Sequence, residues 1–183
     1  MELWVFGYGS LIWRPGFPYE QAEPARLHGY HRSLCVYSYV HRGTPDKPGL
    51  VMGLDRGGSC RGMAYRVAES DRQSVLQYLR EREQSTMVYK ERVLKIHFTQ
   101  EKAGLPRSTR ALVYCVDRSH KQYAGALDRR VQLEIVQGAE GQSGINPHYV
   151  IETSRALQSL GVQDATLEWL SKELRAQDAA LTL

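Results

Sequence analysis

The hydrophobic and polar positions of this chain follow a strand-like pattern before residue 70, and helical patterns first appear after it. Before residue 70, short apolar runs rich in aromatic and β-branched residues alternate with glycine and proline, a pattern typical of strands. We expect strands at residues 3–8, 30–39, 50–54 and 61–67. The last two flank residues 55–58, Asp-Arg-Gly-Gly, which predict a turn because glycine supplies the positive φ angles that tight turns require.

After residue 70 the spacing becomes helical. Val75, Leu76 and Leu79 lie three and four residues apart, so we expect a helix that Ser70 or Asp71 caps. Two more strand-like runs follow, at residues 89–98 and 111–116.

Three helical patterns come last in the chain. They cover residues 122–136, residues 147–160 with Asn146 as the cap and Pro147 at the first position, and residues 165–174 with Asp164 as the cap. Strands gathered first with helices behind them indicate an α+β fold. No repeat or linker divides the sequence, so we expect a single domain over residues 1–183.

The composition excludes several classes of function. Of the 183 residues, 42% are hydrophobic and 24% charged, and basic and acidic residues are interspersed with a net charge of only +4, so we expect no nucleic-acid partner. The longest apolar runs, residues 3–6 and 111–116, fall far short of the about 20 residues that a membrane helix needs. We also expect no secretory signal after Glu2.

The cysteines and histidines limit the possible disulfides and metal sites. Cys35, Cys60 and Cys115 are odd in number and far apart, which predicts reduced thiols in a cytoplasmic protein. The six histidines form no metal-binding motif, so we expect no metal site.

A glycine-rich loop, residues 7–11, follows the first predicted strand. It begins like a dinucleotide-binding fingerprint, but Ile12 stands at the third glycine position, and Pro15 and Pro18 prevent a long helix from starting there. Two interpretations stay open. Either the backbone N–H groups approach a small anionic ligand, or the loop is a tight turn without a ligand.

The helix after residue 70 ends in two glutamates with different surroundings. At 100° per residue, Glu83 lies about 20° from Leu76 in projection, whereas Glu81 points to the opposite side. A carboxylate on the buried stripe has a raised pKa and is a candidate proton carrier. The alternative is that the helix frays and Glu83 pairs with Arg82 or Lys90 at the surface.

Six segments between residue 1 and about residue 169 match the sequence motifs of one known family, in the same order along the chain. They are Phe6-Gly7-Tyr8-Gly9-Ser10-Leu11-Ile12-Trp13; His41-Arg42-Gly43-Thr44-Pro45 with Pro48-Gly49-Leu50; Gly53-Leu54-Asp55 with Gly57-Gly58; Gly62-Met63-Ala64-Tyr65-Arg66; Arg82-Glu83 with Tyr89; and Gly144-Ile145-Asn146 with Tyr149. Together they resemble the ChaC-like family of glutathione-specific γ-glutamylcyclotransferases.

The resemblance implies a compact α+β domain built on a mixed, barrel-like sheet with flanking helices. It also implies a reaction on a small molecule that needs no metal or organic cofactor: the α-amino group of a γ-glutamyl residue attacks its own γ-carbonyl. The products are 5-oxoproline and, from glutathione, Cys-Gly. Two rivals stay open, namely cyclisation of other γ-glutamyl amines or dipeptides and a non-catalytic regulatory module linked to cation transport.

Residue roles follow from the same resemblance. Glu83 would be the general acid/base, and Tyr149 and Tyr89 would supply phenolic hydrogen bonds, with packing at the rim as the alternative for each tyrosine. The γ-glutamyl cradle would comprise Phe6, Gly7, Tyr8, Gly9, Ser10 and Leu11.

One position departs from the family pattern. Relatives commonly have a glycine two residues before the tyrosine, where this chain has Met87. A side chain disfavours positive φ angles, so we expect the loop after Glu83 to take a different path.

Overall fold

The computed structural model describes the backbone of residues 2–181 and the side chains of residues 2–177. These residues form two compact units: one comprises residues 2–33 and 53–120, and the other comprises residues 34–52 and 121–181. The single domain expected from the sequence stays a prediction.

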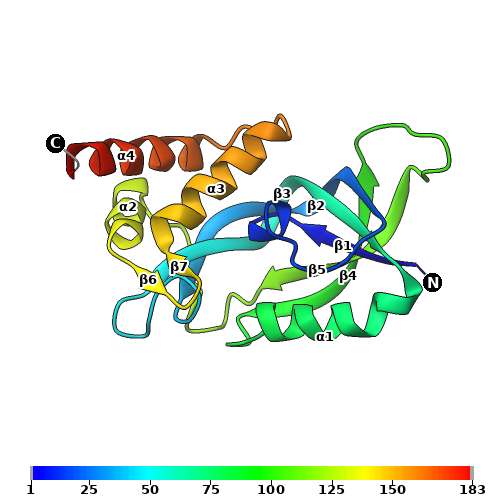
Figure 1. The fold of residues 1–183 in the computed structure, drawn as a ribbon, viewed down its shortest axis with the longest axis horizontal. Helices are drawn as coiled ribbons and strands as arrows, with labels where there is room; N and C mark the ends of the chain where they lie inside the picture. Colours follow the sequence, from blue (N-terminus) through cyan, green and yellow to red (C-terminus); the bar gives the residue numbers. More distant parts are fainter. Residues whose placement is uncertain (1, 182–183) are drawn as a thin grey trace. The chain divides into compact units, whose positions relative to one another are not determined.

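Five strands form a closed barrel in the order β1-β3-β2-β4-β5 (Figure 1). β1 pairs antiparallel with β3 and parallel with β5, where Val5 lies opposite Leu112, so the sheet is mixed. This confirms the expected α+β fold with a mixed, barrel-like sheet. The strands are β1 Leu3–Gly7, β2 Gln21–Ser38, β3 Gly49–Val67, β4 Tyr89–Phe98 and β5 Ser108–Val116.

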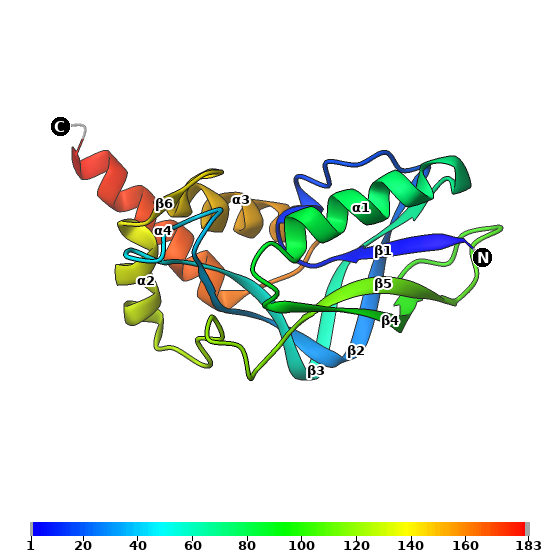
Figure 2. The same ribbon diagram turned by 90° about the horizontal axis from the view of Figure 1, so that it is seen from below.

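The helix after residue 70 forms as α1, Arg72–Glu83, and follows a short 3-10 turn, η2, Glu69–Asp71. Asp71 stands at the N-cap position, but its side chain makes no capping hydrogen bond. Val75 and Leu79 are buried, as their spacing predicts. Figures 1 and 2 show α1 lying along one side of the barrel.

Two strand predictions are wrong in extent. β3 is one continuous strand through residues 55–58, not two strands around a turn. Gly57 and Gly58 do have positive φ angles of 102° and 68°, but they lie inside the continuous strand and do not reverse the chain. β2 begins nine residues before the expected 30–39 run, because pairing with β4, for example Ala25 with Phe98, extends it into a polar stretch.

The second unit holds three helices and a short hairpin, in which α4 packs on both α2 and α3 (Figure 1). The hairpin leads directly into α3. The elements are α2 Arg129–Gln137, β6 Glu140–Gly141, β7 Gly144–Ile145, α3 Asn146–Ser159 and α4 Ala165–Leu181.

The caps of these helices differ from expectation in two places. α2 begins at Arg129 and not at residue 122, because the Asp128 carboxylate accepts the N–H of Arg130 at 2.8 Å and Gly125 has a φ of 67°. Asn146 does not cap α3 with its side chain. Fully buried, it accepts the N–H of Leu50 at 2.7 Å and donates to the Leu50 carbonyl at 2.8 Å. Asp164 does cap α4, accepting the N–H of Leu167 at 3.0 Å.

Candidate active site

Glu83 is the last residue of α1, and its side chain is only 16% exposed. Burial raises the pKa of this carboxyl, and the neighbouring Arg82 guanidinium acts in the opposite direction. Glu81 is exposed and accepts a hydrogen bond from Gln77. The helix therefore extends far enough to place Glu83, and not Glu81, on the sheltered side, as helical geometry predicts.

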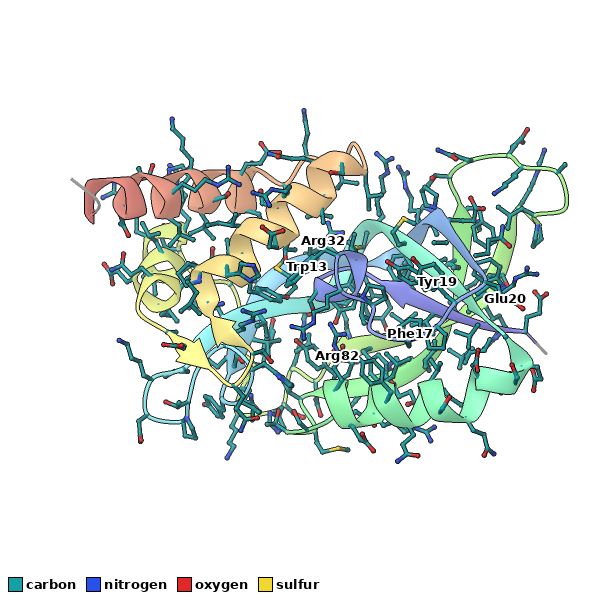
Figure 3. All side chains as sticks on the ribbon, viewed as in Figure 1. Trp13, Phe17, Tyr19, Glu20, Arg32 and Arg82 are labelled. Carbon is teal, nitrogen blue, oxygen red and sulfur yellow. The ribbon has the colours of Figure 1, made fainter. Side chains whose placement is uncertain are left out.

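Arg82, labelled in Figure 3, links this helix end to the loop after β1. Its Nε lies 3.3 Å from Glu83 Oε1, and its Nη2 donates to Ser10 Oγ at 2.9 Å. Lys90, the other candidate partner of Glu83, pairs instead with Asp117 at 2.7 Å. The Nη1 atom of Arg82 donates to three further oxygens: Arg14 O at 2.7 Å, Pro15 O at 3.0 Å and Tyr78 Oη at 2.8 Å.

The glycine loop turns its carbonyl groups toward the protein. The carbonyl of Tyr8 accepts from Arg32 Nε at 2.6 Å, and that of Leu11 accepts from the Tyr65 hydroxyl at 2.9 Å. In the described residues, 2–181, no acceptor receives the N–H of Gly9, Ser10 or Leu11. A cluster of backbone donors without protein acceptors is a feature of anion-binding loops.

Close packing explains the glycine at position 7. A Cβ there would lie 2.9 Å from the Leu11 Cβ, so the loop folds back tightly on its own strand. Phe6, one residue earlier, is fully buried in β1. Its side chain therefore belongs to the core, and any contact it makes with a ligand would come from its backbone.

Tyr8 points its ring into the first unit. Its hydroxyl donates to the Tyr114 carbonyl at 2.8 Å. Burial raises the pKa of Tyr114, with smaller contributions from the negative charges of Glu91 and Glu83.

The two other tyrosines expected at the site lie in different units. Tyr89 is the first residue of β4, is 8% exposed, and its carbonyl accepts a 3.3 Å hydrogen bond from Gln84 Nε2. Tyr149 lies on α3 in the second unit, where its hydroxyl accepts the N–H of Met52 at 2.9 Å. The structure thus connects Ser10 and Glu83 through Arg82, whereas Tyr149 belongs to the second compact unit.

The loop after Glu83 contains the departure noted in the sequence. Met87 has a φ of 62°, and its N–H donates to the Gln84 carbonyl at 3.2 Å. The expectation that methionine would avoid a positive φ is wrong. The side chain of Met87 is 62% exposed and points into solvent, so it adds no clash in the left-handed conformation. The remaining steric cost is that of its Cβ against the backbone.

Two residues around the loop escaped the sequence interpretation. Arg32 and Tyr65 each hold loop carbonyls, yet both lie on strands far from the loop in sequence. Tyr65 stands in a segment with family resemblance, but nothing in the local pattern around Arg32 distinguishes it from a surface arginine. Among the described side chains, no group of three or more His, Cys, Asp or Glu residues could hold a metal ion. Within that same part of the chain, no helix is both long enough and apolar enough to cross a membrane.

Comparison with known proteins gives matches over nearly the whole chain. A family model described as ChaC-like protein matches residues 3–177. The chain is 34% identical to gamma-glutamylcyclotransferase 2-3 of Arabidopsis thaliana, over 96% of this chain and 89% of that protein. It is 31% identical to the glutathione-specific gamma-glutamylcyclotransferase of Schizosaccharomyces pombe, over 96% and 94% respectively. The mouse glutathione-specific gamma-glutamylcyclotransferase 1 is 33% identical, over 91% of this chain and 75% of its own length.

A solved structure shares the fold. The crystal structure of a γ-glutamylcyclotransferase specific to glutathione from yeast matches with a TM-score of 0.83 at 22% sequence identity, covering 96% of each chain.

Proposed function

Because this chain belongs to the ChaC-like protein family, we propose that it is a γ-glutamylcyclotransferase that converts glutathione to 5-oxoproline and Cys-Gly. The observation that carries the proposal is the Glu83 carboxyl, sheltered from water and linked through Arg82 to the loop after β1. Curated relatives that are glutathione-specific support glutathione over other γ-glutamyl amines.

The reaction needs a group that moves protons between two nitrogens. The substrate's α-amino group is an ammonium at neutral pH, and the Glu83 carboxylate takes a proton from it. The amine then attacks the γ-carbonyl carbon, the new C–N bond closes the five-membered ring, and the bond to the cysteine nitrogen breaks. In total, two protons leave the attacking nitrogen and two reach the leaving nitrogen, and Glu83 carries them one at a time.

The raised pKa of Glu83 suits this double role. A group that both accepts and returns protons works best when its pKa lies near the working pH, and burial moves the glutamate in that direction. Ring closure is intramolecular, so the protein's main task is to hold the substrate in the cyclising conformation.

The loop at residues 7–11 is proposed to receive the negative oxygen. The backbone N–H groups of Gly9, Ser10 and Leu11 are donors of the kind that stabilise an oxyanion or a carboxylate. We propose Tyr89 and Tyr149 as further contacts of the γ-glutamyl group on the family resemblance alone. For Phe6, Gly7 and Tyr8, we propose contributions from the main chain.

The surroundings of the reaction follow from its chemistry. Each step is a proton transfer or an addition–elimination at a carbonyl carbon, so we propose no metal or organic cofactor. The three cysteines are buried free thiols, which supports action in the cytoplasm, where thiols stay reduced. We propose neither a nucleic-acid nor a membrane partner.

One assay tests the proposal. Purified protein is incubated separately with glutathione and with γ-glutamyl-alanine, and 5-oxoproline is measured by chromatography. Release from glutathione supports the proposal. Release from the dipeptide alone would indicate the broader cyclotransferase, and release from neither would leave the regulatory module as the better interpretation.

A further inference from the structure

Arg32 lies on β2 and is labelled in Figure 3; it makes two hydrogen bonds to backbone carbonyls on two different segments. Its Nε donates to the Tyr8 carbonyl at 2.6 Å, and its Nη2 donates to the Arg61 carbonyl on β3. Among the described side chains, no carboxylate forms an ion pair with it. A half-buried guanidinium that bonds only to carbonyls serves to orient backbone, because it neutralises no acid.

The bond to Tyr8 fixes more than one atom. The Tyr8 carbonyl and the Gly9 N–H belong to the same planar trans peptide, in which the C=O and N–H bonds point in opposite directions. Turning the carbonyl toward Arg32 therefore turns the Gly9 N–H to the other face of the loop. Gly9 is buried, yet its N–H has no acceptor within the described residues.

A buried donor without an acceptor is costly, so its orientation needs a cause. The other anchored carbonyls of the loop do not supply one. Tyr65 holds the carbonyls of Leu11 and Ile12, and Arg82 reaches those of Arg14 and Pro15. These contacts act on later peptides, whereas the bond from Arg32 acts on the Tyr8–Gly9 peptide itself.

We propose that Arg32 is a positioning residue for the cyclisation: by holding the Tyr8 carbonyl it directs the Gly9 N–H at the oxygen on which negative charge develops. The inference rests on the proposed function. It adds a specific donor and the residue that orients it.

The kinetic test uses Arg32→Gln and Arg32→Lys, with Arg110→Gln as the matched control. Arg110 also donates to a backbone carbonyl, that of Val93 at 3.1 Å, but on the exposed outside of the barrel. Loss of one oxyanion donor typically lowers kcat by about 10²-fold or more. We expect that loss in Arg32→Gln with KM changed by less than about threefold, a smaller loss in Arg32→Lys, and no loss in Arg110→Gln.

The pH profile separates positioning from an effect on the acid/base group. Burial and Arg82 set the pKa of Glu83, and Arg32 does not contribute. The acid limb of kcat/KM in Arg32→Gln should therefore coincide with that of the wild type, at a lower plateau. A shifted limb, an unchanged kcat, or a loss confined to KM would overturn the positioning role.

A binding measurement keeps the test valid even if the Arg32 variants fold poorly. In the Glu83→Gln protein, which retains Arg32, glutathione should shift the Gly9 amide resonance in a nitrogen-edited NMR spectrum and leave the exposed Gly104 amide unmoved. An unmoved Gly9 amide at saturating glutathione would overturn the inference. Absence of 5-oxoproline from the wild type would overturn the proposed function instead, so the two failures are distinct.

Discussion

Arg82 Nε lies 3.3 Å from Glu83 Oε1, and both side chains are 16% exposed. The same guanidinium donates to Ser10, so one residue joins the proposed acid/base to the loop that would hold the substrate. Its charge opposes the effect of burial on the pKa of Glu83. Arg82 therefore influences both the protonation of Glu83 and its position.

Replacing Arg82 should change the pH dependence of turnover. In Arg82→Gln the opposing positive charge is gone, so the pKa of Glu83 rises further and the acid limb of kcat/KM moves to higher pH. Arg82→Lys keeps the positive charge but loses the planar guanidinium that donates several hydrogen bonds. The acid limb of its kcat/KM profile should therefore stay nearer that of the wild type, while the maximum of kcat/KM falls. The measurement is a pH–rate profile on glutathione.

Arg80→Gln is the control for this experiment. Arg80 lies two residues before Arg82 on α1 and forms a bidentate ion pair with Glu91, not with Glu83. Its acid limb should match the wild type. An Arg82→Gln limb that stays in place would mean that Glu83 is not the group that titrates.

The two glutamates at the end of α1 form a matched pair of variants. Glu83→Gln keeps the shape of the side chain but removes the titrating group, so we expect 5-oxoproline release to fall by about 10³-fold. Glu81→Gln should retain nearly full activity, because Glu81 is exposed and its carboxylate accepts a hydrogen bond from the exposed Gln77. Equal activity in both variants would show that another base carries the protons.

Titration of Glu83 should also make the folding stability of the protein depend on pH. Because burial raises its pKa, the folded protein holds a proton over a pH range in which the unfolded chain has released it, and stability falls as the pH rises through that range. The contribution is complete below the ordinary glutamate pKa of about 4.3. Glu83→Gln lacks this titration. The Tm of the variant minus that of the wild type should therefore increase as the pH rises, and then become constant.

Thermal unfolding monitored by circular dichroism at several pH values measures this difference. Glu81→Gln serves again as the reference, with a Tm difference from the wild type that does not change over the same interval. A Glu83→Gln difference that is equally flat would show that burial does not raise the pKa of Glu83.

Met87 offers a simple stabilising substitution. A left-handed φ costs a residue with a Cβ about 1–2 kcal/mol, and the exposed side chain gives little packing in return. Met87→Gly should raise the free energy of unfolding by up to about 1 kcal/mol, since the greater freedom of glycine in the unfolded chain offsets part of the gain. Urea denaturation measures the change.

Met87→Ala separates the backbone effect from the loss of the side chain. Alanine keeps the Cβ and therefore the unfavourable φ, so this variant should show no gain. A similar change in the alanine and glycine variants would place the effect in the side chain and not in the backbone angle.

Local pattern was enough to predict several elements at their true positions. β4 spans residues 89–98 as expected, because Leu94, Ile96 and Phe98 alternate with polar residues in its second half. α1 forms where Val75 and Leu79 supply its buried positions, and it extends through the charged residues 80–83 to Glu83 as expected. These are elements whose own sequence carries the information.

Other features depend on partners that are distant in sequence. The course of β3 through Gly57 and Gly58 reflects pairing along the barrel, since the same glycines serve equally well in a tight turn. Asn146 prefers the backbone of Leu50 to its own helix N-terminus. The contact of Arg32 with the Tyr8 carbonyl exists only because the folded barrel places β2 beside the loop at residues 7–11, so no local pattern predicts it.

The pairing of β1 with β5 has a consequence for how activity appears during folding. These strands come from opposite ends of the first unit, so the barrel closes only after contacts of long sequence separation form, which is a slow step. The loop at residues 7–11 continues directly from β1, whereas α1 forms from local contacts. In refolding experiments, helical signal should therefore recover first, and turnover of glutathione should report the moment of closure.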